Sequence, residues 1–545
     1  MNPSRILLVN PKIAEPGHWY HFPLGLTYVA TALKQHGFSV TGINLCHKRE
    51  SVGESIRRAM QAGDIDIVAT GGISLFWREI SEVLSEAKRC NPQVKTIVGG
   101  PLVTAQPQLA MQHLPIDIGV LGEGEITTVE AVRALESGTL LENVDGIVFR
   151  ANDDPCRFTR PREPIMNLDG IPYPDYDILD FGTLLDTIES EENTYLEACE
   201  RPRPAEIIAS RSCPFSCTFC YHPLGKKYRQ RSVDNVIGEV EMLISRYRIN
   251  VINLLDELLA ADEERLLEFS RRIAPLGVRW VANLRVDKVT RKALQAMKDS
   301  GAFLIFFGVE SINDEVLRSM RKGITREQIE SAFRLAGEVG IRANGHIILG
   351  DVADTEETVA ESLQWVKSHP EYNIQTDFVL AIPDAPIYRQ ARARGLIPDE
   401  LAHVRNKFPI VNMSRIPERR FQKLVDRLRR ENREMAFAAT ATLLAARELE
   451  NDPLGASLFR LRCPVCGREA EYRRGANVSR TWTGVVCRHC HRCLRAPSAQ
   501  IFPKAWRAEY GGVERGILRA AMSLARAARR VAGRCRGTFL KGWRH

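Results

Sequence analysis

Two long stretches of this 545-residue chain alternate short β-branched runs with amphipathic helical patterns, and this alternation limits the fold more than any other feature. In residues 1–150 each strand-like run precedes a stretch of helical period, and the runs are RILLVN, FSVTGIN, DIVATGG, KTIVGG and DIGVLGEGE. Strand–helix alternation of this kind packs as a parallel, doubly wound sheet with helices on both faces. We therefore predict an α/β fold whose N-terminal sheet binds ligands at the carboxyl ends of its strands.

The alternation resumes in residues 205–395 with six further strand-like runs, namely EIIAS, VINLLD, RWVANLR, LIFFGVE, RANGHIILG and FVLAIP. Six β–α units predict a partial (β/α)6 TIM-type barrel, with its functional residues at the strand C-terminal ends. Residues 151–204 are rich in proline and then in acids, so we expect a linker that lies over the surface. Residues 396–460 carry many charge pairs and are expected to form a helical extension.

Composition places the chain among folded proteins, with 44% hydrophobic and 26% charged residues. The opening MNPSRILLVNP lacks the apolar core of a signal peptide. The longest apolar run, MAFAATATLLAA, is shorter than the roughly 20 residues of a membrane-spanning helix. We expect a cytoplasmic protein whose thiols stay reduced. Its 13 cysteines are odd in number and clustered, which favours metal binding over disulfides.

Three cysteines lie within eight residues in SCPFSCTFCYH, directly after the first strand of the second alternation. Cys213, Cys217 and Cys220 offer soft thiolates, which suit zinc or an iron–sulfur cluster. His222 could complete a structural Cys3His zinc site, which is the alternative interpretation. An iron–sulfur cluster on three cysteines leaves one iron open, and an open coordination position implies chemistry.

This segment resembles the CxxxCxxC signature of the radical S-adenosylmethionine (SAM) superfamily, including the aromatic Phe219 before the last cysteine. The resemblance implies that the three cysteines hold a 4Fe–4S cluster whose fourth iron binds SAM, and that one electron cleaves SAM to a 5′-deoxyadenosyl radical. It also implies SAM contacts after later strands, at Asp256, Glu257, Arg285, Glu310 and Ser311. For Arg285 and Glu310 the alternative is a barrel ion pair. LAIPDAP replaces the family's Pro-Gly-Thr-Pro, which puts the substrate edge of the sixth strand in doubt.

The glycine-edged N-terminal sheet resembles the cobalamin-binding domain of the class B, cobalamin-dependent radical SAM enzymes, on FPLGLTYVATALKQHGFSV, TGGIS, VGGPLVT and LGEGE. The resemblance implies that residues 1–150 bind cobalamin through Ser74, Gly99, Gly100, Pro101, Thr104, Gly122, Glu123, Gly124 and Glu125. The Asp-x-His-x-x-Gly signature of a cobalt-ligating histidine is absent, because His18 and His47 lack that spacing. Loss of cobalamin binding is the alternative, in which the glycines only make turns.

A second cysteine cluster lies in residues 461–496, where Cys463-x-x-Cys466 precedes Cys487-x-x-Cys490. Paired CxxC motifs at this separation predict a zinc-ribbon-like module with a closed, structural Zn²⁺ site. His489 and Cys493 could replace one ligand. An auxiliary iron–sulfur cluster is the competing interpretation.

The formal net charge of +8 is concentrated in the basic tail, residues 497–545, which has nine Lys or Arg residues and no acid from position 515 onward. As a helix the tail would be amphipathic, with Ile517, Leu524 and Val531 on the face opposite Arg519 and Arg526. Binding to an anionic membrane at its inner face, docking on nucleic acid phosphates and packing on the barrel are the three interpretations.

Together these features predict a cobalamin-dependent radical SAM enzyme, in first place a methyltransferase that acts at an unactivated carbon with SAM and methylcobalamin. Oxidative ring closure, as in the oxygen-independent magnesium-protoporphyrin monomethyl ester cyclase, is the second interpretation. The third is a nucleic-acid-binding or RNA-modifying protein that uses the zinc ribbon and tail. The expected partners are a small-molecule or lipid-like substrate and an electron donor such as flavodoxin or ferredoxin, with nucleic acid less favoured.

Overall fold

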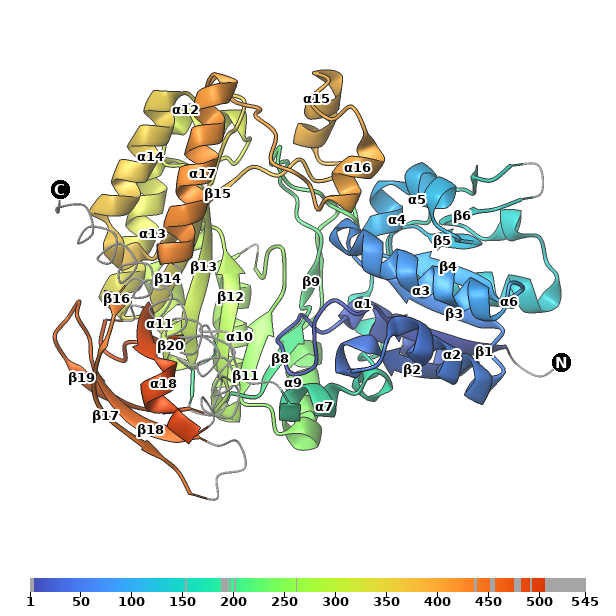
Figure 1. The fold of residues 1–545 in the computed structure, drawn as a ribbon, viewed down its shortest axis with the longest axis horizontal. Coiled ribbons are helices and arrows are strands. Elements are labelled where there is room, and N and C mark those ends of the chain that lie inside the picture. The colour runs from blue at the N-terminus through green and yellow to red at the C-terminus, as the bar shows by residue number, and fades with distance from the viewer. Residues whose placement is uncertain are drawn as a thin grey trace, which may run out of the picture. The chain divides into compact units, whose positions relative to one another are not determined.

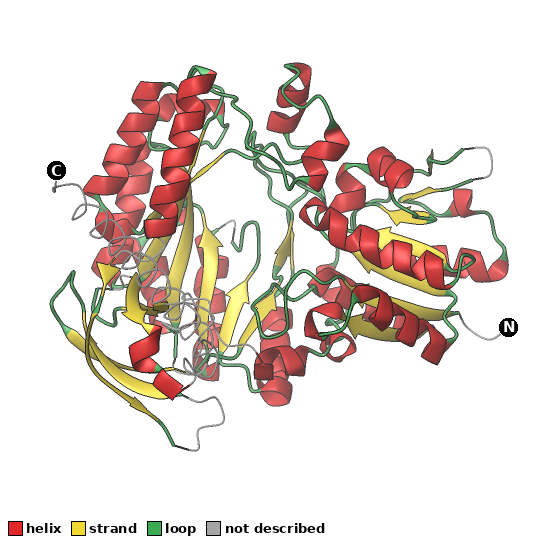
Figure 2. Ribbon diagram, viewed as in Figure 1, coloured by secondary structure: helices red, strands yellow, loops and turns green. Residues whose placement is uncertain are grey.

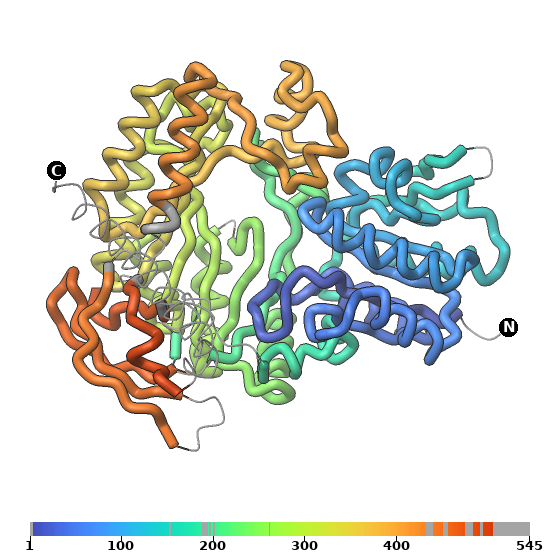
Figure 3. Tube along the Cα trace, viewed as in Figure 1, coloured from blue at the N-terminus to red at the C-terminus, as the bar shows by residue number. Residues whose placement is uncertain are grey.

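The computed structural model of the protein describes residues 4–151, 154–187, 195, 198–199, 202–260, 262–435, 439–450, 456–474, 482–490 and 493–504. The chain forms two compact units, a first unit of Met1–Glu434 and a second unit of Met435–His545. Figures 1 and 3 trace the chain through both. The predicted tail helix lies outside the described residues.

The first unit begins with a seven-stranded sheet in the order β2-β1-β3-β4-β5-β6-β7 (Figure 1). The first five strands in this order are parallel, while β6 and β7 run antiparallel at the edge. The strands are β1 Arg5–Asn10, β2 Ser39–Asn44, β3 Ile67–Gly71, β4 Lys95–Gly99, β5 Ile118–Val120, β6 Ile147–Phe149 and β7 Arg157–Phe158. The sheet therefore continues past residue 150, into the stretch expected to be a linker.

Helices cover both faces of this sheet, as the alternation predicted. They are α1 Leu24–Gln35, α2 Val52–Gly63, α3 Trp77–Cys90, α4 Pro101–Ala105, α5 Pro107–His113 and α6 Gly124–Ser137. In β1, Leu8 packs in the core under α1 and α6, and its neighbour Leu7 packs in the core under α2 and α3. Successive side chains of a strand point to opposite faces, so the buried run RILLVN feeds two cores at once.

A second, six-stranded sheet follows in the order β15-β14-β13-β12-β11-β8, and all its pairings are parallel. Its strands are β8 Pro204–Ile207, β11 Val251–Leu254, β12 Arg279–Leu284, β13 Ala302–Glu310, β14 Arg342–Leu349 and β15 Ile374–Phe378. The helices between them are α9 Val233–Tyr247, α10 Glu263–Ile273, α11 Arg291–Asp299, α12 Asp314–Ser319, α13 Arg326–Val339 and α14 Glu356–Ser368. This arrangement is the predicted partial barrel, visible as curved strands backed by helices in Figure 2.

Side-chain caps fix where these helices begin. The side chains of Ser232, Asp262, Thr290, Thr325 and Thr355 each accept a hydrogen bond from a backbone N–H in the first turn of the helix that follows. A cap of this kind satisfies one of the free donors at a helix start and contributes about 1 kcal/mol. Four of these caps stand between a strand and the next helix, whereas Thr325 stands between α12 and α13.

Residues 168–187 are packed into the structure and are not a surface linker as expected. The short 3-10 helix η5, Tyr176–Leu179, and helix α7, Phe181–Thr187, place Tyr176, Leu179 and Phe181 in the core cluster of the barrel. The Tyr176 hydroxyl donates to Glu239 of α9 at 2.8 Å. Aromatic and aliphatic side chains set within the prolines and acids give this segment its buried face.

The predicted helical extension ends earlier than residue 460. Helices α15 Pro386–Ala393, α16 Glu400–Arg405 and α17 Glu418–Met435 are followed by strands, not by further helix. Strand β17, Thr442–Glu448, pairs antiparallel with β18, Ser457–Arg462. The alternating residues Phe459 and Leu461 of β18 are buried. This period of two is typical of a strand, and the charged residues around it obscure it in the sequence.

The described residues of the second unit form two three-stranded sheets, β17-β18-β19 and β16-β21-β20. Its remaining elements are β16 Ala439–Thr440, β19 Glu469–Arg474, β20 Trp482–Val486, β21 Cys493–Pro497 and α18 Ser498–Ile501. Its core contains Phe459, Leu494 and Phe502 together with two cysteines, Cys463 and Cys487. Among the described residues, no helix is both long and apolar enough to cross a bilayer.

Candidate active site and metal centres

The loop with the first three cysteines leaves the first barrel strand and is closed at its base by a short hairpin. Strand β9, Ser210–Arg211, pairs antiparallel with β10, Arg229–Gln230, and we call the intervening residues 212–228 the cluster loop. Ser212, just before Cys213, has a φ of 68°. A non-glycine residue in the left-handed region costs of order 1–3 kcal/mol and is typical of functional sites.

The far side of the cluster loop is anchored to the barrel. The backbone N–H of Thr218 donates to the carbonyl of Met320 at 2.9 Å, and the Thr218 carbonyl accepts from Ile387 at 2.8 Å. The Arg285 guanidinium lies over the Phe215 ring, 3.6 Å from its centroid. Arg285, predicted to contact SAM, therefore also holds the loop that carries the cysteines.

Cys217 lies among cations. A hydrogen bond with Cys220, together with the charges of Lys322 and Arg285, lowers the pKa of Cys217 to about 6. The same hydrogen bond, with burial, raises the pKa of Cys220, and burial raises that of Cys213. A thiolate beside cations is the form of cysteine that binds iron.

The spacing of the three sulfurs bears on which metal they could hold. Within the described part of the chain, the only group of three or more ligand atoms that lie within 4.8 Å of one another belongs to the second unit. The Sγ atoms of Cys213, Cys217 and Cys220 do not all lie within that distance of one another, although a hydrogen bond keeps the sulfurs of Cys217 and Cys220 close. His222, the fourth ligand of the zinc alternative, pairs through Nδ1 with Glu257 at 2.9 Å, and its buried Nε2 has no hydrogen-bond partner among the described residues. The preference for an iron–sulfur cluster therefore rests on the CxxxCxxC motif in the sequence and not on the spacing of the sulfurs.

Asp256, two residues past the end of β11, has a buried oxygen without a donor. Its Oδ1 accepts from the Ser210 hydroxyl at 2.6 Å, while Oδ2 makes no hydrogen bond to the described residues. Burial raises the pKa of Asp256 to about 6. Buried carboxylate oxygens normally have a partner, so Oδ2 fits the predicted contact with the amino group of SAM.

Glu310, the last residue of β13, is paired with a lysine that sequence reasoning missed. Lys322 Nζ donates to Glu310 Oε1 at 2.7 Å, and both side chains are buried. Glu310 has a φ of 64° and follows a bulge in the pairing of β13 with β14. A Cβ at Gly308 would lie 2.6 Å from Lys322 Nζ and 2.8 Å from Glu310 Oε1, so a larger residue there would displace the ends of these two paired side chains.

Arg285 and Glu310 do not pair with each other, but each forms an ion pair of its own, which is the alternative considered for both residues. Arg285 Nε donates instead to Asp287 at 2.9 Å, and its Nη2 donates to the Lys322 carbonyl at 3.0 Å. Ser311 is buried and its hydroxyl accepts from the backbone N–H of Asn313 at 3.2 Å. No spacing in the sequence marks Lys322, because it lies in the turn after α12, away from any strand end.

The residues predicted to bind cobalamin lie at the carboxyl ends of β3, β4 and β5, on one edge of the N-terminal sheet. Part of the glycine pattern is explained by packing alone: a Cβ at Gly71 would lie 2.7 Å from the Gly99 carbonyl, and Gly100, with a φ of 87°, packs against Gly72. Gly122 has a φ of 73°, which by itself favours glycine, and a Cβ there would meet no atom within 4 Å. The turn at Gly122 therefore leaves room at this edge of the sheet.

The other predicted cobalamin contacts have mixed surroundings. Ser74 begins the 3-10 helix η2, Ser74–Phe76, and is buried. Pro101 begins α4, and the Thr104 hydroxyl accepts from the Gly122 backbone N–H at 3.0 Å. The carboxylates of Glu123 and Glu125, on either side of Gly124, form ion pairs with arginines of the barrel.

The four cysteines of the second unit come together as predicted. Their Sγ atoms lie within 4.8 Å of one another, with 3.6 Å between Cys463 and Cys490 and 3.7 Å between Cys466 and Cys487. Four sulfurs about 2.3 Å from a tetrahedral zinc would be about 3.8 Å apart. His489 does not belong to this group of four, and its Nε2 lies 3.1 Å from the Glu469 carbonyl. The geometry fits one ion, and it disfavours the auxiliary cluster.

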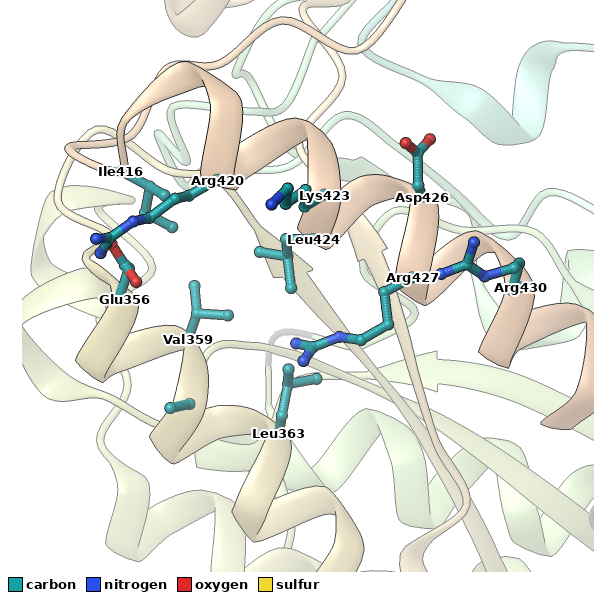
Figure 4. A pocket seen from close by; sticks show the side chains of 11 residues that line it. Glu356, Val359, Leu363, Ile416, Arg420, Lys423, Leu424, Asp426, Arg427 and Arg430 are labelled. Carbon is teal, nitrogen blue, oxygen red and sulfur yellow. The ribbon is translucent and has the colours of Figure 1, made fainter.

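A groove between α14 and α17 is a separate feature of the first unit (Figure 4). Its cavity of about 550 Å³ has an apolar floor that includes Val359, Leu363 and Leu424. Four cations line it, namely Arg420, Lys423, Arg427 and Arg430. It includes none of the predicted site residues, so we assign it to neither cofactor.

Comparison with known proteins identifies the same parts. Residues 207–366 match the radical SAM superfamily, and residues 17–132 match the B12 binding domain. An uncharacterized methyltransferase of Pyrococcus horikoshii is 31% identical over 386 residues, which cover 69% of this chain and 79% of that protein. The chain therefore belongs to the cobalamin-dependent radical SAM enzymes, whose cofactors are a 4Fe–4S cluster, SAM and cobalamin.

Two further proteins are similar over most of the chain. The anaerobic magnesium-protoporphyrin IX monomethyl ester cyclase of Rubrivivax gelatinosus is 28% identical over 377 residues, covering 67% of this chain and 65% of the cyclase. The structure of the radical SAM methyltransferase TsrM from Kitasatospora setae, with cobalamin and a 4Fe–4S cluster bound, superposes with a TM-score of 0.59 at 20% identity. That superposition covers 72% of this chain and 75% of TsrM, and it establishes the fold.

Proposed function

We propose that this chain transfers a methyl group from SAM to a carbon of a small molecule, with cobalamin as the methyl carrier. The observation that carries the proposal is the 31% identity to a methyltransferase, which extends over 79% of that protein. Two features of the structure support it. The edge at Gly122 leaves room for cobalamin, and the unpartnered Oδ2 of Asp256 offers an acceptor to SAM.

The residues of this chain bind and orient the cofactors and neutralise buried charges. The cofactors supply the radical and the transferable methyl group when bound. Cys213, Cys217 and Cys220 would hold the cluster, on a loop fixed by Arg285. Ser210 donates to Oδ1 of Asp256 and leaves Oδ2 without a donor. Oδ2 would accept a hydrogen bond from the amino group of SAM. The buried Lys322–Glu310 pair adds no net charge beside the loop.

The test is product analysis with the full chain, reconstituted anaerobically with iron, sulfide and hydroxocobalamin. Methyl transfer consumes two SAM per turnover, so S-adenosylhomocysteine and 5′-deoxyadenosine should form in about a one-to-one ratio with the true substrate. Label from methyl-deuterated SAM should appear in the product. Wild-type protein that binds no cobalamin, or an unlabelled product, would overturn the proposal.

Replacing each cysteine of the cluster loop with alanine should abolish 5′-deoxyadenosine formation. Cys90→Ala is the matched control, since Cys90 is exposed on α3, outside the site. Unchanged 5′-deoxyadenosine formation in the loop variants would refute the assignment of the cluster.

Ring closure is a second candidate, favoured by the 28% identity to the cyclase of Rubrivivax gelatinosus. A cyclase would release 5′-deoxyadenosine without stoichiometric S-adenosylhomocysteine, and its product would carry no methyl label. The same product analysis therefore decides between the two reactions.

The remaining partners are also proposals. SAM cleavage needs one external electron, and we propose a donor such as flavodoxin or ferredoxin and a lipid-like substrate class. A cytoplasmic location with the tail on an anionic membrane predicts salt-sensitive liposome binding that is lost without residues 515–545. Retention of RNA crosslinking only when residues 461–545 are present would favour the nucleic-acid interpretation instead.

A further inference from the structure

Two buried arginines close the base of the cluster loop, and both are paired with carboxylates of the N-terminal sheet. Arg211 and Arg229 lie opposite each other in the β9–β10 hairpin. Arg211 donates to Glu123 at 2.6 Å and to Glu125 at 2.5 Å. Arg229 donates to both oxygens of Glu123, at 2.9 and 2.8 Å. All four side chains are at most 10% exposed.

The arginines of the hairpin need the carboxylates of the N-terminal sheet to neutralise their buried charges. Two buried guanidinium groups on facing strands repel each other, and each would be a costly unpaired charge without a carboxylate. Glu123 bridges the two arginines, and its Oε2 also accepts from the backbone N–H of Ile165 at 2.6 Å. Closure of the hairpin is therefore tied to its contact with the N-terminal sheet.

The position of this contact links the two expected cofactor sites. Glu123 is the N-cap residue of α6 and Glu125 lies in the first turn of that helix, one and three residues after the open edge at Gly122. Arg211 lies two residues before Cys213. One buried ion cluster thus joins the turn expected at cobalamin to the loop expected at the iron–sulfur cluster.

We propose that Glu123, Glu125, Arg211 and Arg229 form a positioning clamp, which holds the cluster loop at a fixed spacing from the edge of the cobalamin-binding sheet. These are positioning residues, because they are paired with one another and not aimed at reacting atoms. The catalytic part of the test rests on the proposed function, whereas the structural part does not.

The structural test is hydrogen exchange in the full chain without cofactors. Glu125→Gln keeps the shape of the side chain and removes the charge that faces Arg211. Amide exchange in residues 212–228 should accelerate by at least about tenfold, as expected when a loop opens locally. Arg430→Gln, which removes an exposed cation of the α14–α17 groove, is the control and should leave this exchange unchanged.

A double variant separates pairing from general damage. Arg211→Gln combined with Glu125→Gln should accelerate the exchange of the cluster loop by less than the product of the two single effects, because both changes remove the same ion pair. If Glu125→Gln does not fold, Arg229→Lys serves in its place, since lysine keeps the charge but loses the second nitrogen, with which the guanidinium reaches Ser212 while Nη1 holds Glu123. Unchanged exchange in every single variant overturns the clamp.

The catalytic test uses the reconstituted enzyme with SAM, hydroxocobalamin and a strong reductant. Glu125→Gln should keep 5′-deoxyadenosine formation within about threefold, and should lower S-adenosylhomocysteine formation by more than about tenfold, because spacing and not the cluster is perturbed. Equal loss of both products contradicts positioning. A wild type that forms no S-adenosylhomocysteine refutes the proposed function, while the exchange result still decides the clamp.

Discussion

Replacing Cys487 with serine tests whether the second unit is organised around a single ion. Cys487 and Cys463 are almost fully buried and pack with Phe459 and Leu461 in the small core of this unit. Serine has a hard oxygen in place of a soft thiolate, so it should release the metal. The empty site would then leave polar groups in a core that has few apolar residues to replace the lost ligation.

The magnitude follows from the sulfur spacing. Sγ–Sγ distances of 3.6 and 3.7 Å put the centre of a tetrahedron about 2.2 Å from each sulfur, against about 2.3 Å for a zinc–thiolate bond. Structural zinc contributes an apparent 10–16 kcal/mol, roughly, in small metal-dependent modules. That exceeds the stability of a typical domain, so metal loss should unfold the second unit.

The assay combines metal analysis, X-ray absorption and hydrogen exchange on the full chain. We expect about one zinc per chain with four sulfurs near 2.3 Å, and loss of exchange protection in β18 and β19 of Cys487→Ser. Cys90→Ser, which changes an exposed cysteine of the first unit, is the control. Iron with metal–metal scattering, or protection that survives metal removal, would refute the reasoning.

Three further changes test other parts of the first unit. The pKa of Asp256 is near 6 in the folded protein and about 4 in the unfolded chain. Its burial therefore does not affect the free energy of unfolding below pH 4, and it destabilises the folded protein as the pH rises from 4 through 6. Asp256→Asn should therefore stabilise the cofactor-free protein by up to about 3 kcal/mol at pH 8 and by nothing at pH 4 in denaturant unfolding; equal effects would contradict this. Lys322→Met should cost about 3–5 kcal/mol, because the Glu310 charge stays buried without a partner; adding Glu310→Gln should recover most of it, and no recovery would count against the pair. Gly42→Ala should cost about 3 kcal/mol or more by overpacking, since its Cβ would lie 2.0 Å from the Ile178 carbonyl; a thermal midpoint equal to wild type would show that residues 168–187 can move away.

The two cysteine motifs could be recognised in the sequence because their signals are local. Cys213, Cys217 and Cys220 lie in one loop, so their spacing can be read directly from the sequence. The loop follows the end of the first barrel strand. The paired CxxC motifs work in the same way, since each turn presents two thiolates whatever surrounds it. Lys322 was missed because its partner, Glu310, lies twelve residues away across a bulge.

By itself, the sequence determined the fold class, the order of the two α/β parts and the grouping of the four cysteines of the second unit, because hydrophobic period and motif spacing depend on neighbours along the chain. Only the tertiary structure decided what Glu123 and Glu125 do, since their partners Arg211 and Arg229 lie more than 80 residues away. It also decided that residues 168–187 are core and that β17 and β18 are strands. Charge pairing and burial between distant segments depend on which surfaces meet, and no local pattern encodes that.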